Sequence, residues 1–128
     1  VSGTYKPVVG EWSATADGSD DILWLNPNGS DPLFESNGSD AFTSSRVNVP
    51  NRKALVADSP GKDLLLLWGG AAADQVWLRE TDGTEVLALR GGAKAPDPSI
   101  AFTGAFVSSS FASAFFYRPG TASELLLF

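Results

Sequence analysis

Short apolar runs separated by polar turns follow one another along the whole chain. The runs are about four to seven residues long, are rich in Val, Leu, Phe and Trp, and are bounded by Gly, Pro, Asn, Asp and Ser, which is the pattern of β-strands. No stretch keeps the 3.6-residue period of a helix over three turns. The pattern therefore predicts an all-β protein, with strands at roughly 5–12, 21–26, 31–36, 41–49, 53–58, 63–68, 75–80, 85–90, 99–106, 113–118 and 124–128.

Groups of strands recur along the chain at a constant step of 47 residues. Laying the chain over itself at this step superposes two sets, the apolar residues Val8, Leu55 and Phe102 and the small residues Gly10, Ala57 and Gly104. A fixed period between about 20 and 50 residues is typical of solenoids, propellers and repeat arrays. We therefore expect a single repeat domain over 1–128, with repeats at approximately 1–49, 50–95 and 96–128 and a third repeat that stops before its fourth strand.

The strands within a repeat differ in polarity. The second strand of each repeat is continuously apolar, as in 63–68, which suits a strand buried on both faces. The last strand of the first repeat, 41–48, is more polar, as suits an outer strand exposed to water. This grading predicts four-stranded blades of the propeller type. The residues expected in the core are Val8, Ile22, Trp24, Leu33, Leu55, Leu65, Val76, Phe102, Phe115 and Leu126.

Three segments of the first repeat carry a resemblance to a known family. Residues 3–12, residues 17–24 and the turn at 36–38 ahead of Phe42 and Thr43 together resemble the FG-GAP/VCBS-like repeats of secreted bacterial β-propellers. The likeness is good over 1–49, partial over 50–92 and faint over 95–128. It implies four-stranded antiparallel blades, an extracellular setting, and a role in adhesion or in the recognition of carbohydrate or protein.

The same resemblance implies an acidic loop that binds calcium between the first two strands of a blade. In this chain Glu11, Asp17 and Asp21 supply carboxylates in that loop, whereas Ala14 and Ala16 stand where the family has further ligands. Calcium takes six to eight oxygen ligands, so Thr15 or backbone carbonyls would have to complete the set. The alternative is that the acidic and Gly residues form an ordinary solvated turn. Calcium is the one candidate ion, and no other cofactor is expected.

Composition argues against several function classes. The formal charge is −6 and the nine basic residues are scattered, whereas nucleic-acid surfaces need clustered Lys and Arg. The chain has no His and no Cys, which closes the Ser–His–Asp and Cys–His routes of catalysis and the usual zinc sites. No apolar run approaches the roughly 20 residues that span a bilayer. We expect no nucleic-acid partner, no enzyme activity and no membrane span.

An acidic residue recurs at equivalent positions of the three repeats, as Asp31, Asp74 and Glu124. An active site is normally unique, so repetition favours a structural role such as the capping of a turn over a pair of catalytic carboxylates. This observation supports a protein that binds rather than one that catalyses.

Aromatic side chains are the candidate ligand contacts. Indole faces stack on sugar rings and offer an N–H donor, so we expect an exposed aromatic to bind a glycan beside an acid or amide. The residues expected at this site are Trp77 and Trp68, then Tyr117, with Asp74 or Gln75. The segment 74–77 also resembles the Gln-x-Trp motif of ricin-type β-trefoil lectins, which makes the β-trefoil the alternative fold. Against it, the motif occurs once and the third repeat is unfinished.

Three function classes remain open. The favoured one is a secreted, extracellular recognition module, lectin-like, that binds glycans or a surface protein. The others are a structural protein that assembles into a ring, filament or coat, and a non-catalytic domain of a larger secreted enzyme. A ring propeller needs about four to eight blades, so we also expect a homo-oligomer or completion by further blades.

Overall fold

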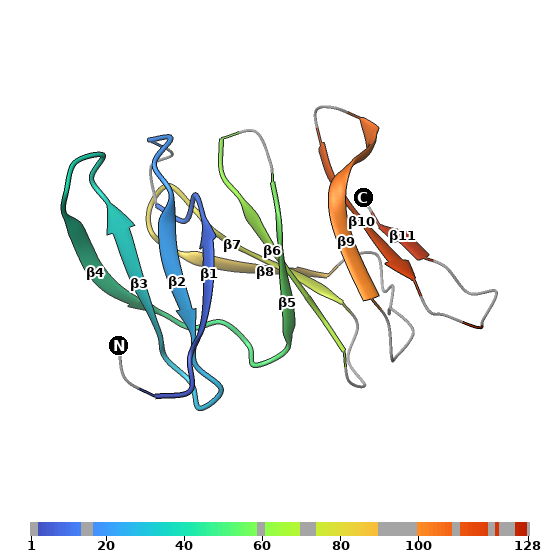
Figure 1. Cartoon of the computed structure of the whole chain (residues 1–128), viewed down its shortest axis with the longest axis horizontal. Coiled ribbons are helices and arrows are strands. Elements are labelled where there is room, and N and C mark those ends of the chain that lie inside the picture. The colour runs from blue at the N-terminus through green and yellow to red at the C-terminus, as the bar shows by residue number, and fades with distance from the viewer. Residues whose placement is uncertain are drawn as a thin grey trace.

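The computed structural model in Figure 1 describes residues 3–13, 17–58, 61–69, 74–89, 100–108, 111–117, 120 and 125–127. These residues form eleven strands and no helix, and so contain no helix that could cross a membrane. The prediction of an all-β protein is confirmed. The strands are β1 (Lys6–Gly10), β2 (Asp21–Leu25), β3 (Asp31–Ser36), β4 (Phe42–Val47), β5 (Lys53–Ala57), β6 (Leu64–Trp68), β7 (Gln75–Arg79), β8 (Glu85–Leu89), β9 (Ile100–Ser108), β10 (Phe111–Tyr117) and β11 (Leu125–Leu127).

The strands form three antiparallel sheets, each of which runs in chain order. Sheet 1 contains β1 to β4, sheet 2 contains β5 to β8, and sheet 3 contains β9, β10 and β11. The expected four-stranded antiparallel sheets are therefore present, and the described part of the third sheet has three strands. Sheet 2 lies between sheets 1 and 3 (Figure 1).

The first strands of the three sheets lie next to one another, because β5 contacts both β1 and β9. The Nζ of Lys6 donates a hydrogen bond to the carbonyl of Ala54 at 3.4 Å. The hydroxyl of Thr103 donates to the carbonyl of Val56 at 2.6 Å. Strand β5 is thus tied to sheet 1 on one side and to sheet 3 on the other. The first residues of these strands are 47 residues apart in each case, at Lys6, Lys53 and Ile100.

The larger core lies between sheets 1 and 2. Trp12 and Trp77 are both fully buried there, with ring centroids 5.9 Å apart. Gly10 permits the close approach of the chain at this point, since a Cβ on it would lie 2.8 Å from Asp63 Oδ2 and 2.8 Å from the Trp12 ring. The other buried side chains of this core are Val8, Leu23, Leu33, Val47, Val49, Ala54, Leu65 and Leu67.

A second core lies between sheets 2 and 3. Phe116 of β10 is buried and meets Trp68 of β6 edge to face, with ring centroids 5.7 Å apart. Leu66 and Val76 of sheet 2 complete the buried cluster. Sheet 2 therefore has a core on each face, which explains why its second strand, Leu64–Trp68, is apolar at every position.

Half of the predicted core residues lie in the two cores. Val8, Leu33, Leu65 and Val76 are buried, as expected. Leu55 is half-buried and packs against the second core. These positions lie on strands that the apolar runs located correctly.

Four predictions for the core are wrong. Ile22 and Trp24 are only half-buried because they flank Leu23, which takes the inward position of β2. Phe102 is 49% exposed and Phe115, which pairs with it, is half-buried, because no described strand packs on the face of sheet 3 that carries them. The side chain of the remaining predicted core residue, Leu126, lies outside the described ones.

Candidate functional site

A pocket of about 250 Å³ opens at one end of sheet 1. Three segments meet there: the residues that lead into β1, the turn between β2 and β3, and the connection from β4 to β5, all at the lower end of sheet 1 in Figure 1. We call this hollow the sheet 1 pocket. Its lining residues are Thr4, Tyr5, Lys6, Leu25, Asn26, Pro27, Asp31, Val49, Pro50, Asn51 and Arg52.

The turn between β2 and β3 forms one wall of the sheet 1 pocket. Its sequence, Asn-Pro-Asn-Gly, is a strong turn signal because Asn side chains bond to nearby backbone and Gly tolerates a positive φ. The carboxamide oxygen of Asn26 accepts a hydrogen bond from the N–H of Asn28 at 3.0 Å, and Gly29 has a φ of 104°. These contacts within the turn favour its shape locally.

The carboxylate of Asp31 joins two walls of the pocket. Its Oδ1 accepts the N–H of Asn26 at 2.7 Å, and its Oδ2 accepts the N–H of Val49 at 2.7 Å. The side chain is 1% exposed. Burial raises the pKa of the Asp31 carboxyl above its ordinary value, its two backbone N–H bonds oppose that shift, and the nearby charge of Glu85 adds to it. The expected structural role of this repeated acidic residue is confirmed at Asp31.

The connection between sheets 1 and 2 forms the other wall. The carboxamide of Asn51 donates to the carbonyl of Pro27 at 3.0 Å and so reaches across to the turn. The guanidinium of Arg52 donates to the carbonyl of Gly69 at 2.9 Å and to Gln75 Oε1 at 3.3 Å. The pocket is thus held in shape by contacts to both sheets.

The chemistry of the sheet 1 pocket suits a polar ligand. Tyr5 offers an aromatic ring, and Asn26 and Asn51 offer carboxamides. Lys6 and Arg52 bring two cations to this pocket, in a chain with a charge of −6. An aromatic face beside a few convergent polar groups is the usual make-up of a small-molecule site.

The structure does not present the predicted tryptophans to solvent. Trp77 is 0% exposed, and its indole N–H donates to Glu85 Oε2 at 3.0 Å. Trp68 is 9% exposed and packs against Phe116. The expectation that these two rings are exposed is wrong, because each lies between two sheets and packs against another aromatic ring, Trp12 in the case of Trp77 and Phe116 in the case of Trp68.

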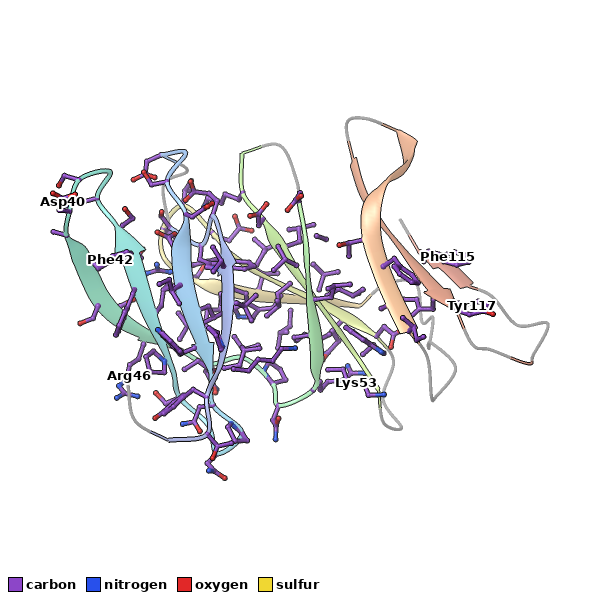
Figure 2. All side chains as sticks on the ribbon, viewed as in Figure 1. Asp40, Phe42, Arg46, Lys53, Phe115 and Tyr117 are labelled. Carbon is purple, nitrogen blue, oxygen red and sulfur yellow. The ribbon has the colours of Figure 1, made fainter. Side chains whose placement is uncertain are left out.

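The other predicted ligand contacts are separated from one another. Asp74 is fully buried, with its Oδ1 3.7 Å from the Arg52 guanidinium, and Gln75 accepts a hydrogen bond from the same guanidinium. Asp74 and Gln75 therefore help to position Arg52, which lines the sheet 1 pocket. Tyr117 is 38% exposed and lies on sheet 3, at the opposite end of the row of sheets (Figure 2).

The acidic loop after β1 uses its carboxylates to bind backbone. Asp21, which is 0% exposed, accepts the N–H of Trp12 at 2.9 Å on one oxygen and the N–H of Ser36 at 2.8 Å on the other. Glu11 accepts the N–H of Gly18 at 2.8 Å. Burial raises the pKa of the Asp21 carboxyl, and the charge of Glu11 adds to the shift.

This loop does not assemble the expected ligand set. Asp17 is exposed and accepts the N–H of Ser19 at 2.8 Å. In the described ranges no three acidic side chains are grouped closely enough to hold a metal ion. The predicted calcium site at Glu11, Asp17 and Asp21 is therefore not formed by these side chains, and Ala14 and Ala16 lie outside the described residues.

None of the residues that line the sheet 1 pocket was among the predicted ligand contacts, although the sequence does contain a turn signal for one of its walls. The Asn-Pro-Asn-Gly sequence predicts a turn, but no sequence feature of residues 49–52 indicates that they lie against this turn. The recurrence of an acidic residue at Asp31 indicated a structural role for this side chain, but not a pocket beside it. Comparison of the chain with models of protein families, with curated proteins and with solved structures finds no match.

Proposed function

We propose that the chain is a non-catalytic recognition module of an extracellular, propeller-type protein, and that it binds a glycan or a glycan-bearing surface protein in the sheet 1 pocket. Two features support the blade architecture. The sheets run in chain order with their first strands side by side, and those strands start 47 residues apart. Sheet 2 has an apolar core on each face, as a blade between two others does.

The observation that carries the proposed binding is the pre-formed pocket around Tyr5. Its walls are joined by the buried carboxylate of Asp31 and by the bond from Asn51 to Pro27. A ligand therefore meets a ring, two carboxamides and two cations without first ordering a loop, and binding avoids that entropic penalty. At about 250 Å³ the pocket is slightly smaller than the roughly 300–1,000 Å³ of ordinary small-molecule sites, which favours one sugar residue over a long chain.

Such a site binds weakly on its own. Stacking on one ring plus a few hydrogen bonds gives an affinity of about millimolar to micromolar. Several copies acting on one surface would raise the apparent affinity without any new contact. A module of this kind therefore works in an assembly, as a ring of blades or as several chains together.

The experiment is binding to a glycan array, with hits titrated by calorimetry. We expect Tyr5→Ala to weaken binding at least about tenfold, because stacking of a sugar on the ring is lost. Tyr117→Ala removes the same side chain from the far end of the molecule and should leave affinity within about twofold. Tyr5→Phe keeps the ring and separates stacking from the hydroxyl.

Two results would count against this function. Absence of binding to every glycan at millimolar concentration removes the lectin-like role, and the loss of binding in Tyr117→Ala but not in Tyr5→Ala moves the site to sheet 3. Circular dichroism of each variant checks that the β-structure is retained.

A second candidate function is assembly without a small ligand. The observation that favours it is the apolar character of the outer faces of sheets 1 and 3, where Val9, Phe42, Ile100 and Phe102 are all about half exposed. In this alternative the stack of blades is completed by another chain or by a second copy, and the structure serves as a part of a ring, filament or coat.

A further inference from the structure

The outer face of sheet 1, turned away from sheet 2, is apolar. Antiparallel pairing places Val9, Ile22 and Phe34 side by side in one row across β1, β2 and β3. Val9 is 54% exposed, and the other two are half-buried. Phe42 of β4, labelled in Figure 2, belongs to the same face and is also 54% exposed.

The outer face of sheet 3, turned away from sheet 2, is apolar as well. Pairing places Phe102 opposite Phe115 and Ile100 opposite Tyr117. Ile100 and Phe102 are 52% and 49% exposed. Phe115 and Tyr117 lie on the side of the molecule away from sheet 1 in Figure 2. The opposite face of the same strands carries Phe116, which is buried against sheet 2.

The junction inside the chain shows how two such faces pack. Sheet 1 contributes the row Val8, Leu23 and Leu33, and sheet 2 contributes the row Val56, Leu65 and Trp77. Both rows belong to the larger core. The junction of sheets 1 and 2 is therefore one apolar row laid on another.

The two outer faces are equivalent by position to the two halves of this junction. Phe102 lies 47 residues beyond Leu55 and 94 beyond Val8, at the same place in its first strand, and Phe115 pairs with it as Leu23 pairs with Val8. On the other outer face, Val9 occupies the place that Val56 has in sheet 2.

The same equivalence holds for the remaining members of that row. Ile22 pairs with Val9 as Leu65 pairs with Val56, and Phe34 takes the place of Trp77. The row Val9–Ile22–Phe34 is thus built to receive a row of the kind that contains Phe102 and Phe115. The outer face of sheet 1 is therefore complementary to the outer face of sheet 3.

We propose that the outer face of sheet 3 docks on the outer face of sheet 1 of a second copy of this chain, and that two copies related by a two-fold axis close a ring of six sheets. This inference rests on the blade architecture of the proposed function, not on its glycan. A contact between unlike faces must either close or grow into a filament, and six blades lie inside the range of about four to eight for closed propellers.

A second copy is the occupant because the docking continues an interface that the chain already contains. Sheet 2 receives sheet 1 on one face and sheet 3 on the other through apolar rows. A second copy repeats the row of sheet 1 and the row of sheet 3 in the same registers. Association buries Phe102, Val9 and their neighbours, which are otherwise an unusually apolar exposed surface.

The test is sedimentation of the 128-residue chain at micromolar concentration. We expect a dimer of twice 13.4 kDa. Phe102→Glu and Val9→Lys each place a charge in one of the two faces and should each weaken dimerisation at least about a hundredfold. Leu87→Glu is the matched control, because Leu87 is 46% exposed on β8 and lies on neither outer face.

Mixing the two variants separates this arrangement from others. A mixed dimer of Phe102→Glu with Val9→Lys has one unaltered contact and one in which the new Glu faces the new Lys, so an equimolar mixture should regain the dimer. A dimer that persists in Val9→Lys alone overturns the proposal in favour of pairing of like faces. A wild-type monomer overturns it as well.

Glycan binding can be tested independently of dimerisation. Tyr5 lies in the sheet 1 pocket and on neither outer face, so Tyr5→Ala should sediment as the wild type does. Dimerisation without glycan binding refutes the proposed ligand alone, and glycan binding by a wild-type monomer refutes the docking alone.

Discussion

Replacement of Trp77 shows most clearly whether its ring binds a sugar or holds the core together. The sequence favours it as an exposed platform for a sugar, whereas in the structure it is fully buried against Trp12, with its indole N–H bonded to Glu85. Trp77→Ala removes the ring from the middle of the core between sheets 1 and 2. We expect the protein to lose stability, not only a binding contact.

The expected loss of unfolding free energy in Trp77→Ala can be estimated from the cost of the cavity, the lost ring contact and the lost hydrogen bond. Replacing a buried Trp by Ala typically lowers the free energy of unfolding by about 3–5 kcal/mol, including the cavity that remains. Of this, the contact with the Trp12 ring accounts for about 0.5–1.5 kcal/mol. The bond to Glu85, a residue that is itself exposed, accounts for about 1 kcal/mol. Domains of this size unfold with about 5–15 kcal/mol, so the loss is at least about a fifth of the total and can approach all of it.

Urea denaturation followed by far-ultraviolet circular dichroism measures the change without relying on the fluorescence of the deleted ring. With a slope of about 2 kcal/mol per molar urea, the midpoint should fall by about 2 M. Trp77→Phe keeps most of the apolar volume and should lose only about 1–2 kcal/mol. Leu87→Ala, at a position that is 46% exposed and lies on neither outer face, should lose less than about 1 kcal/mol.

The reasoning is refuted if Trp77→Ala unfolds within about 1 kcal/mol of the wild type. That result would mean that the ring is not part of the core, and it would restore Trp77 as a candidate ligand contact. A glycan titration of the same variant would then show whether binding is lost.

Three further outcomes are expected. Asp31→Asn should lower the free energy of unfolding by about 1–2 kcal/mol in urea, because the amide nitrogen cannot accept one of the two backbone N–H bonds, an effect partly offset by the removal of a buried charge. Unchanged stability would contradict its role between the pocket walls. The raised pKa values of Asp21 and Asp31 mean that the native state holds more protons than the unfolded chain between the ordinary and the raised pKa. Their contribution to stability should therefore fall as pH rises through that window and then level off, and urea midpoints measured from about pH 3 upward should be flatter in Asp31→Asn. Millimolar calcium should give no heat in calorimetry and leave the urea midpoint unchanged relative to chelator, because the Asp21 oxygens already bind backbone N–H groups; a clear calcium-dependent shift would show that the loop rearranges around the ion.

Part of the candidate site was within reach of the sequence. The turn at 26–29 follows from the local preferences of Asn, Pro and Gly, which act within four residues. The recurrence of an acid at Asp31 and Asp74 indicated a structural carboxylate, and the structure gives Asp31 that role. The contact of Asn51 with Pro27 joins residues 24 apart in the chain, and no local preference specifies a pairing at that range.

The sequence by itself determined where the strands are and how they are spaced. Apolar runs bounded by turn residues located all eleven described strands, and the first strands begin at the 47-residue step that the pattern contains. Both are properties of short segments, since side-chain alternation and turn formation depend on near neighbours.

Only the tertiary structure decided which face of each strand is covered. Every residue of Leu64–Trp68 is apolar, so the sequence does not show which of these side chains face sheet 1 and which face sheet 3. Trp77 is buried because sheet 1 lies over it, whereas Phe102, with the same preference for burial, is 49% exposed because no described strand packs on its side of sheet 3. Burial is a property of the surface that another segment brings to a residue, and that segment lies far away in the chain.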